Sequence, residues 1–133
     1  MTKAPHLLIV DDEPNVLLTL GMIFELDGYK VSKAKSCAEA LGMLSNPTRY
    51  DAVITDLNME RHDVGLDVAR AAMLLNPRPV VVICTGYADL GNTQAALDMR
   101  VDYFATKPVD VDELKNAIRR LKQRNMLARK IAG

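Results

Sequence analysis

Short apolar runs that end abruptly in polar residues constrain the fold of this chain more than any other feature. Ala52–Ile54 is followed by Thr55 and Asp56, and Val80–Cys84 is followed by Thr85. Such runs are typical of strands that are buried on both faces of a parallel sheet. In these sheets ligands bind at the carboxyl ends of the strands, so Asp56 stands where chemistry usually takes place.

Segments with helical spacing separate the apolar runs. Gly28 predicts the end of the first helix, and the pairs Ser36 with Glu39 and Asp110 with Glu113 predict capping boxes. The predicted strands are Leu7–Val10, Tyr29–Ala34, Ala52–Ile54, Val80–Cys84 and Val101–Ala105, the second being an edge strand. The predicted helices run from about Pro14 to Gly28, Ser36 to Asn46, Leu66 to Met73, Asp89 to Met99 and Asp110 to Leu121.

The chain has 133 residues, nearly half of them apolar, and is expected to form one compact domain with a hydrophobic core. We place this domain at residues 1–123 and interpret residues 124–133 as a basic C-terminal tail or the start of a linker. No apolar run has the length of a membrane span, so no membrane partner is expected. Cys37 and Cys84 are the only cysteines, which favours a reduced protein of the cytoplasm.

Charge is unevenly distributed along the sequence, although the formal net charge is zero. No acidic residue follows Glu113, whereas the stretch from Lys115 to Lys130 is rich in lysine and arginine. The rest of the chain is therefore acidic. This is not a nucleic-acid-binding composition for the domain alone, although the basic tail leaves that option open.

Strands and helices alternate five times with short connections, which predicts an α/β fold with a doubly wound parallel sheet and helices on both faces. Right-handed crossovers bring the carboxyl ends of all parallel strands to one edge of the sheet. Polar residues that follow four different strands are therefore expected to converge there. They are Asp11, Asp12, Asp56, Thr85 and Lys107.

The chemistry of this convergent set favours a magnesium-dependent phosphoryl transfer. Carboxylates held close together repel one another, and a hard cation such as Mg²⁺ relieves that repulsion with oxygen ligands. With the metal bound, Asp56 could act as a nucleophile that forms an aspartyl phosphate. Lys107 would supply a second positive charge, and Thr85 a neutral hydroxyl donor, to the phosphoryl oxygens.

Taken in this order on a five-fold β/α pattern, these residues resemble the receiver domain of two-component response regulators. The similarity extends from about Leu7 to Leu121. It implies a flavodoxin-like (βα)5 fold with the strand order 2-1-3-4-5. It also implies that Asp11 and Asp12 bind Mg²⁺ together with Asp56 and the backbone carbonyl of Asn58.

The resemblance further implies how such a domain signals. Asp56 would take a phosphoryl group from a sensor histidine kinase or a histidine phosphotransfer protein. Thr85 and Tyr103 would form the switch pair, and the Lys107–Pro108 peptide bond would be cis. A surface built from the fourth helix, the fifth strand and the last helix would signal to a downstream protein or to a missing C-terminal output domain.

The sequence departs from the family pattern in the loop after Asp56. Glu60 stands where the family usually has proline, and Gly65 comes one residue late. Two residues after Thr85 stands the bulky Tyr87, which is expected to shield the acyl phosphate from water and to slow autodephosphorylation.

Two other functions remain open at this point. The first is a magnesium-dependent phosphatase with an Asp nucleophile, but Asn58 stands where such an enzyme needs a second carboxylate. The second is a receiver-like scaffold that acts without phosphorylation. The intact set of acids, threonine and lysine favours a signalling switch that is not a conventional enzyme.

Overall fold

The computed structural model describes residues 3–46, 48–59, 64–86, 94–95 and 97–132. In chain order its elements are β1 (His6–Val10), α1 (Pro14–Leu26), β2 (Lys30–Ala34), α2 (Cys37–Ser45), β3 (Ala52–Asp56), α3 (Val64–Met73), β4 (Val80–Thr85), β5 (Tyr103–Thr106) and α5 (Val111–Ala132). The predicted helix from Asp89 to Met99 lies largely outside the described residues.

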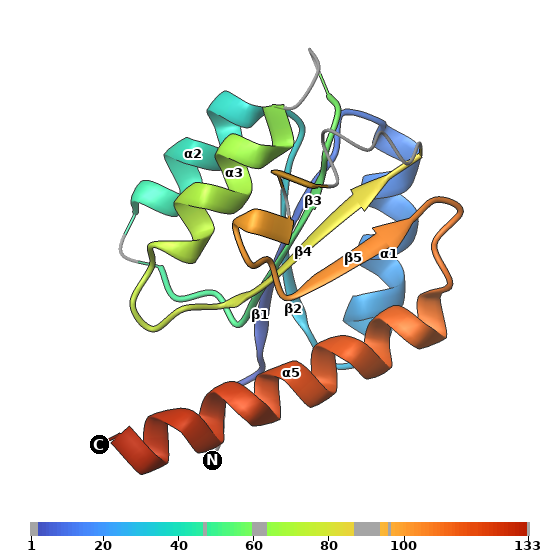
Figure 1. The fold of residues 1–133 in the computed structure, drawn as a ribbon. Helices are drawn as coiled ribbons and strands as arrows, with labels where there is room; N and C mark the ends of the chain where they lie inside the picture. Colours follow the sequence, from blue (N-terminus) through green and yellow to red (C-terminus); the bar gives the residue numbers. More distant parts are fainter. Residues whose placement is uncertain (1–2, 47, 60–63, 87–93, 96, 133) are drawn as a thin grey trace.

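All five strands form one parallel sheet in the order β2-β1-β3-β4-β5 (Figure 1). The predicted doubly wound sheet and its strand order are therefore confirmed. Every residue of β1, β3 and β4 is buried, whereas β2 is only partly buried. This difference explains the sequence pattern, because an edge strand can carry exposed lysines, here Lys30 and Lys33, that strands buried on both faces cannot.

Helices cover both faces of the sheet: α2 and α3 lie on one face, and α1 and α5 lie on the other (Figure 1). Each face has its own hydrophobic cluster, and the residues of β4 alternate between the two. Val81 and Ile83 belong to the cluster under α2 and α3, while Val82 and Cys84 belong to the cluster under α1 and α5. The period of two residues along a strand produces this division.

The predicted helix ends are confirmed by backbone geometry and capping hydrogen bonds. Gly28 has a φ of 93°, a conformation that glycine adopts without strain, directly after α1. The backbone N–H of Glu39 donates to Ser36 Oγ over 3.1 Å at the start of α2. The backbone N–H of Glu113 donates to Asp110 Oδ1 over 3.0 Å at the start of α5.

The last strand and the last helix differ from their expected lengths. β5 begins at Tyr103 rather than Val101, because the carboxylate of Asp102 accepts the N–H of Val81 over 2.8 Å, where a longer strand would continue the ladder. α5 continues without a break to Ala132, so the basic stretch after residue 123 is helical. Lys, Arg, Gln, Leu and Ala are good helix formers, which accounts for this extension.

Neither cysteine forms a disulfide bond, and both are buried. In the part of the chain that the structure describes, no helix is long and apolar enough to cross a membrane.

Gly65 lies where α3 approaches the end of β3 most closely. Its N–H donates to the carbonyl oxygen of Leu57 over 2.8 Å. A Cβ atom at this position would lie 2.0 Å from the carbonyl oxygen of Asp56 and 2.7 Å from Leu57 Cα. Both neighbours are backbone atoms, so they cannot rotate away. Gly65 comes one residue later than the glycine of the family pattern, but it still permits tight contact between α3 and β3, the strand that ends in Asp56.

We expect Gly65→Ala to lower the free energy of unfolding by about 2 kcal/mol or more, because overpacking displaces backbone. Urea denaturation would measure it. Gly42→Ala in α2 is the matched control: no atom lies within 4 Å of its added Cβ, so this substitution should stabilise the protein by up to about 1 kcal/mol. Equal stability of the Gly65→Ala variant and the wild type would contradict the described contact.

Candidate functional site

The polar residues that follow the strands meet at the carboxyl edge of the sheet, as the sequence predicts. Asp11, Asp12 and Asp56 each offer one carboxylate oxygen, and these oxygens lie within 4.8 Å of one another. Lys107 Nζ lies 3.1 Å from Asp11 Oδ2 and 3.5 Å from Asp56 Oδ2. One ammonium group therefore bridges acids from two neighbouring strands.

Hydrogen bonds between backbone atoms hold the strand ends at fixed positions. The N–H of Lys107 donates to the carbonyl oxygen of Thr85 over 2.8 Å, and the N–H of Leu57 donates to that of Cys84 over 2.8 Å. The N–H of Glu13 donates to Asp11 Oδ1 over 2.9 Å, which orients that carboxylate. The Lys107–Pro108 peptide bond is cis, the isomer expected from the resemblance.

The polar residues at this edge of the sheet differ in how deeply they are buried. Asp11 is 3% exposed, Asp56 is 6% exposed and Thr85 is fully buried, whereas Asp12 is exposed. A buried carboxylate loses its hydration, and this loss favours the protonated form. The nucleophile candidate, Asp56, and one metal ligand candidate, Asp11, are thus the two buried acids of the site.

The electrostatics of Asp56 follow from that burial. The pKa of Asp56 is raised from 3.8 to about 6: desolvation by burial is the largest cause, the charge of Lys107 opposes it, and the charges of Asp11 and Asp12 add to the rise. Burial alone would lower the pKa of Lys107, but its hydrogen bond to Asp11 and the charge of Asp56 raise it overall. One ammonium group does not balance three carboxylates, so the site favours binding of a further cation.

The donor set fits Mg²⁺. All three groups are carboxylates, the hard oxygen ligands that this ion prefers, and Asp12 is exposed, so water could complete the coordination. Asn58 follows β3 by two residues and is half-buried. Its backbone carbonyl stays a predicted ligand.

The structure separates the predicted switch pair. Residues that pair in adjacent strands share a face of the sheet, and Tyr103 pairs with Val82 while Phe104 pairs with Ile83. Tyr103 packs with the cluster under α1 and α5, and its hydroxyl donates to Glu113 Oε1 over 2.9 Å. Thr85 lies two residues after Ile83 and so faces the other cluster.

The aromatic residue on the face of Thr85 is therefore Phe104, which packs against the cluster under α2 and α3. The assignment of Tyr103 as the partner of Thr85 needs correction for this geometric reason. Sequence reasoning missed Phe104. Strand alternation was the signal available: it places two consecutive aromatic residues on opposite faces, although it does not say which faces Thr85.

The unusual loop after Asp56 is described only in part. Glu60, Arg61, His62 and Asp63 lie outside the described residues, and so does Tyr87. The predicted effects of these residues on metal affinity and phosphate lifetime stay predictions.

Comparison with known proteins identifies the family that the sequence resembles. A family model described as the response regulator receiver domain matches residues 7–119. The chain is 40% identical over 116 residues to the transcriptional regulatory protein GlrR of Escherichia coli (strain K12), covering 87% of this chain and 26% of that protein. It is 31% identical over 122 residues to the transcriptional regulatory protein PrrA of Mycobacterium leprae, covering 92% of this chain and 52% of that protein.

Solved structures agree. A response regulator receiver domain from Clostridium thermocellum superposes with a TM-score of 0.83 at 32% identity, covering 93% of this chain and 98% of that chain. A CheY-like receiver domain from Methanospirillum hungatei has a TM-score of 0.86 at 26% identity, covering 94% and 98%. The chain thus spans nearly the whole of these domains, but only about a quarter of the first curated relative.

Asp56→Asn should stabilise the metal-free protein above pH 6. The raised pKa means that folding penalises the ionised carboxylate, so the penalty is absent below pH 3.8, grows as the pH rises to about 6 and is complete above it. At pH 7.5 we expect a gain of about 3 kcal/mol, because the pKa rises from 3.8 to about 6 and each pKa unit corresponds to about 1.4 kcal/mol. Urea denaturation in a chelator, repeated between pH 4 and pH 8, would measure it.

The matched control is Asp98→Asn, since Asp98 is exposed and its carboxylate accepts a hydrogen bond from the exposed side chain of Gln94. Its effect should be small and independent of pH. If Asp56→Asn were neutral or destabilising at pH 7.5 without metal, burial would not be penalising the charge of Asp56.

Proposed function

Because the chain belongs to the family of response regulator receiver domains, we propose that it is a phosphorylation-dependent switch. Asp56 would take a phosphoryl group from a sensor histidine kinase or a histidine phosphotransfer protein. The observation that carries this proposal is the gathering of the Asp11 and Asp12 carboxylates and the ammonium group of Lys107 around the buried carboxylate of Asp56 at the carboxyl edge of the sheet.

In the proposed reaction a carboxylate oxygen of Asp56 attacks the phosphorus of a phosphohistidine. An O–P bond forms, the N–P bond breaks, and the imidazole leaves with the electron pair and takes up a proton. Asp56 must be ionised to attack, and burial works against this. The charge of Lys107, 3.5 Å from Asp56 Oδ2, favours the ionised form and would then neutralise an oxygen of the acyl phosphate.

Mg²⁺ held by Asp11, Asp12, Asp56 and the backbone carbonyl of Asn58 would supply charge neutralisation for both the carboxylates and the incoming phosphoryl group. The N–H of Glu13 already orients the carboxylate of Asp11, so this side chain would not need to change rotamer to bind the metal ion. Thr85, at the end of β4, would donate its hydroxyl to the phosphoryl group.

We propose that Thr85 and Phe104, rather than Thr85 and Tyr103, form the switch pair of the conformational response. Both residues of this new pair face the cluster under α2 and α3, so a displacement of the Thr85 hydroxyl can be followed by the ring of Phe104. Phosphorylation would bias two arrangements of these side chains, and the surface of the fourth helix, β5 and α5 would report the difference to a partner.

We propose that the partner is a downstream protein or an output domain that follows residues 1–123, with 124–133 as the start of the linker. The support is indirect: relatives named as transcriptional regulatory proteins are much longer than the matched segment. No observation specifically favours the phosphatase alternative, because Asn58 occupies the position where such an enzyme needs a second carboxylate. A phosphorylation-independent scaffold would not need three acids and a lysine in contact.

The test is the intact mass of the protein after incubation with acetyl phosphate and Mg²⁺. We expect one added phosphoryl group that disappears in Asp56→Asn and in a chelator, because the acids need the metal to accept a phosphate. Asp98→Asn should gain the group as the wild type does, since Asp98 is exposed and distant in sequence from the site.

Failure of the wild type to gain mass, with an unchanged circular dichroism spectrum, would contradict the proposal and favour the scaffold. Steady release of phosphate from small phosphate esters would favour the phosphatase instead.

A further inference from the structure

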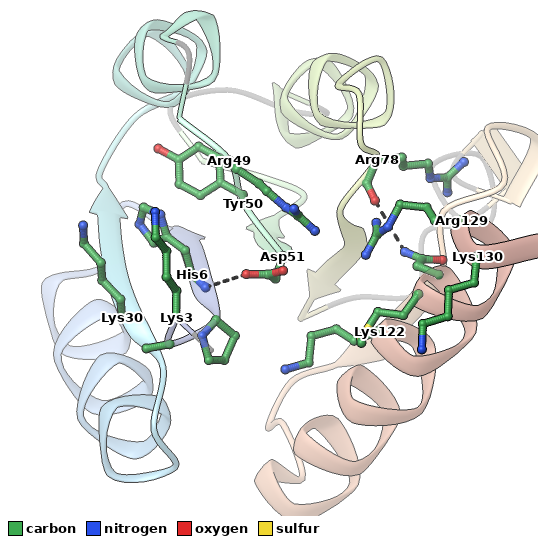
Figure 2. A pocket seen from close by; sticks show the side chains of 14 residues that line it. Lys3, His6, Lys30, Arg49, Tyr50, Asp51, Arg78, Lys122, Arg129 and Lys130 are labelled. Atoms are coloured by element: carbon green, nitrogen blue, oxygen red, sulfur yellow. Dashed lines mark hydrogen bonds between the residues drawn. The ribbon is translucent and has the colours of Figure 1, made fainter. Parts of the chain in front are cut away.

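A second candidate site lies at the opposite edge of the sheet, where β1, β2 and β3 begin. Figure 2 shows a groove of about 1180 Å³ between these strand ends and the last turns of α5. Its floor is near His6 and Asp51, whereas the acids of the phosphorylation site follow the other ends of the same strands. The groove is therefore separate from the site already described.

Positively charged side chains line both walls of this groove. Three of them come from the chain before β1, from the start of β2 and from the loop before β3, and three come from α5. They are Lys3, Lys30, Arg49, Lys122, Arg129 and Lys130. A seventh cation of the lining, Arg78, is paired with Asp102 and is not counted in this set. We call this set the basic groove.

The face of α5 that turns toward the sheet edge is the unusual feature. Lys122, Met126 and Arg129 are spaced at i, i+4 and i+7, so they share one side of the helix, and all three line the groove. An inward face of a helix is normally apolar. Where α5 runs past the sheet, this face instead carries cations.

These cations have no acidic partners in the described part of the chain. The ion pairs found there involve Arg70, Arg78, Lys107, Lys115 and Arg124, none of which is among these six cations, and Arg78 is the one of them that lines the groove. Asp51 is the one carboxylate in the lining, and its Oδ2 accepts the N–H of His6 over 2.8 Å. Lys122 lies over the ring of Tyr29, 4.3 Å from its centroid, which orients it without neutralising it.

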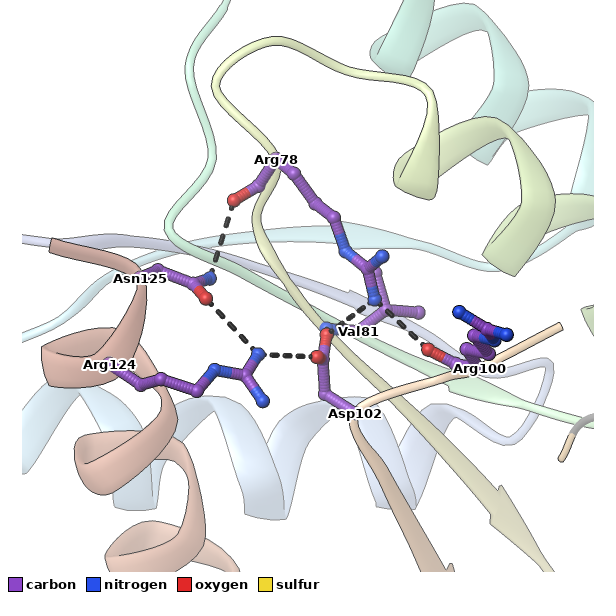
Figure 3. Close-up of polar contacts among 6 residues, drawn as sticks. All are labelled: Arg78, Val81, Arg100, Asp102, Arg124 and Asn125. Atoms are coloured by element: carbon purple, nitrogen blue, oxygen red, sulfur yellow. Dashed lines mark hydrogen bonds and ion pairs between the residues drawn. The ribbon is translucent and has the colours of Figure 1, made fainter. Parts of the chain in front are cut away.

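A polar clasp fixes the α5 wall of the groove (Figure 3). Asp102 is buried, with a side chain 4% exposed, and accepts from Arg124 Nη2 over 2.7 Å and from Arg78 Nη2 over 3.2 Å. The amide of Asn125 donates to the carbonyl oxygen of Arg78 over 3.5 Å. The turn of α5 between Lys122 and Arg129 is thereby tied to the residues just before β4 and β5, which fixes the α5 wall against the sheet.

We propose that the basic groove binds an organic polyphosphate of nucleotide size. Six cations converge from two walls on one hollow, and a polyphosphate places several negative charges on neighbouring atoms. The volume is large enough to admit a nucleotide, and Pro5 and Met126 offer apolar contact for a base. An acidic peptide spreads its charges along its length, at about 3.3 Å per residue. A nucleic-acid duplex is convex and would meet only the rim.

The experiment is a calorimetric titration with ATP and with inorganic tripolyphosphate, in a chelator and at two salt concentrations. The test variant is Arg129→Gln/Lys130→Gln, and the matched control is Arg119→Gln/Arg120→Gln, which removes the same charge from α5 outside the groove. We expect saturable binding at one site, weakened about tenfold or more in the test variant and within about twofold of the wild type in the control. Tripolyphosphate alone should compete with ATP.

Three results would overturn the proposal. Equal weakening in both double variants would mean that only the overall charge of α5 matters. A lack of saturable binding at low salt would mean that the groove does not hold a polyphosphate. Tighter binding of a glutamate decapeptide or of a short DNA duplex than of ATP would assign the groove to a different class of partner.

Discussion

The main physical constraint on this structure is the mutual repulsion of three carboxylates at one edge of a buried sheet. Asp11 and Asp56 are almost fully buried, Asp12 is exposed beside them, and their oxygens lie within 4.8 Å of one another. Such a cluster is tolerated only when a cation accompanies it. Lys107 partly fills this role, with its ammonium group in contact with both buried acids. The same repulsion that raises the free energy of the folded protein would, in the proposed function, make the site receptive to a metal ion and, once the ion is bound, to a phosphoryl group.

The parallel sheet supplies the rigidity that holds these charges together. β1, β3 and β4 are buried along their whole length, and backbone hydrogen bonds join the segments that follow them. Gly65 brings α3 directly against the carbonyl oxygen of Asp56. At the other edge of the sheet the Asp102 clasp holds α5 against β4 with the same kind of buried acid, here fully paired with two arginines. The molecule thus keeps an acidic edge and a basic edge apart on one rigid scaffold.

Much of this arrangement could be predicted from local patterns. Apolar runs ending in polar residues gave the order of the strands and helices, and parallel topology then placed Asp11, Asp56 and Lys107 at one edge. The choice between Tyr103 and Phe104 could not be predicted in this way, because it depends on the register of β5 against β4. The basic groove could not be predicted either. It depends on where α5, which extends beyond the sheet, crosses the amino ends of strands that are far away in sequence.

The most direct measurement is the pKa of the Asp56 carboxyl group, followed by ¹³C nuclear magnetic resonance with and without Mg²⁺. Asp56→Asn would assign the resonance. We expect a pKa of about 6 in the metal-free protein, from burial and the neighbouring acids, and a fall well below that value when Mg²⁺ binds. A metal-free pKa near 3.8 that Mg²⁺ leaves unchanged would contradict the view that this carboxylate belongs to a buried cluster in need of a cation.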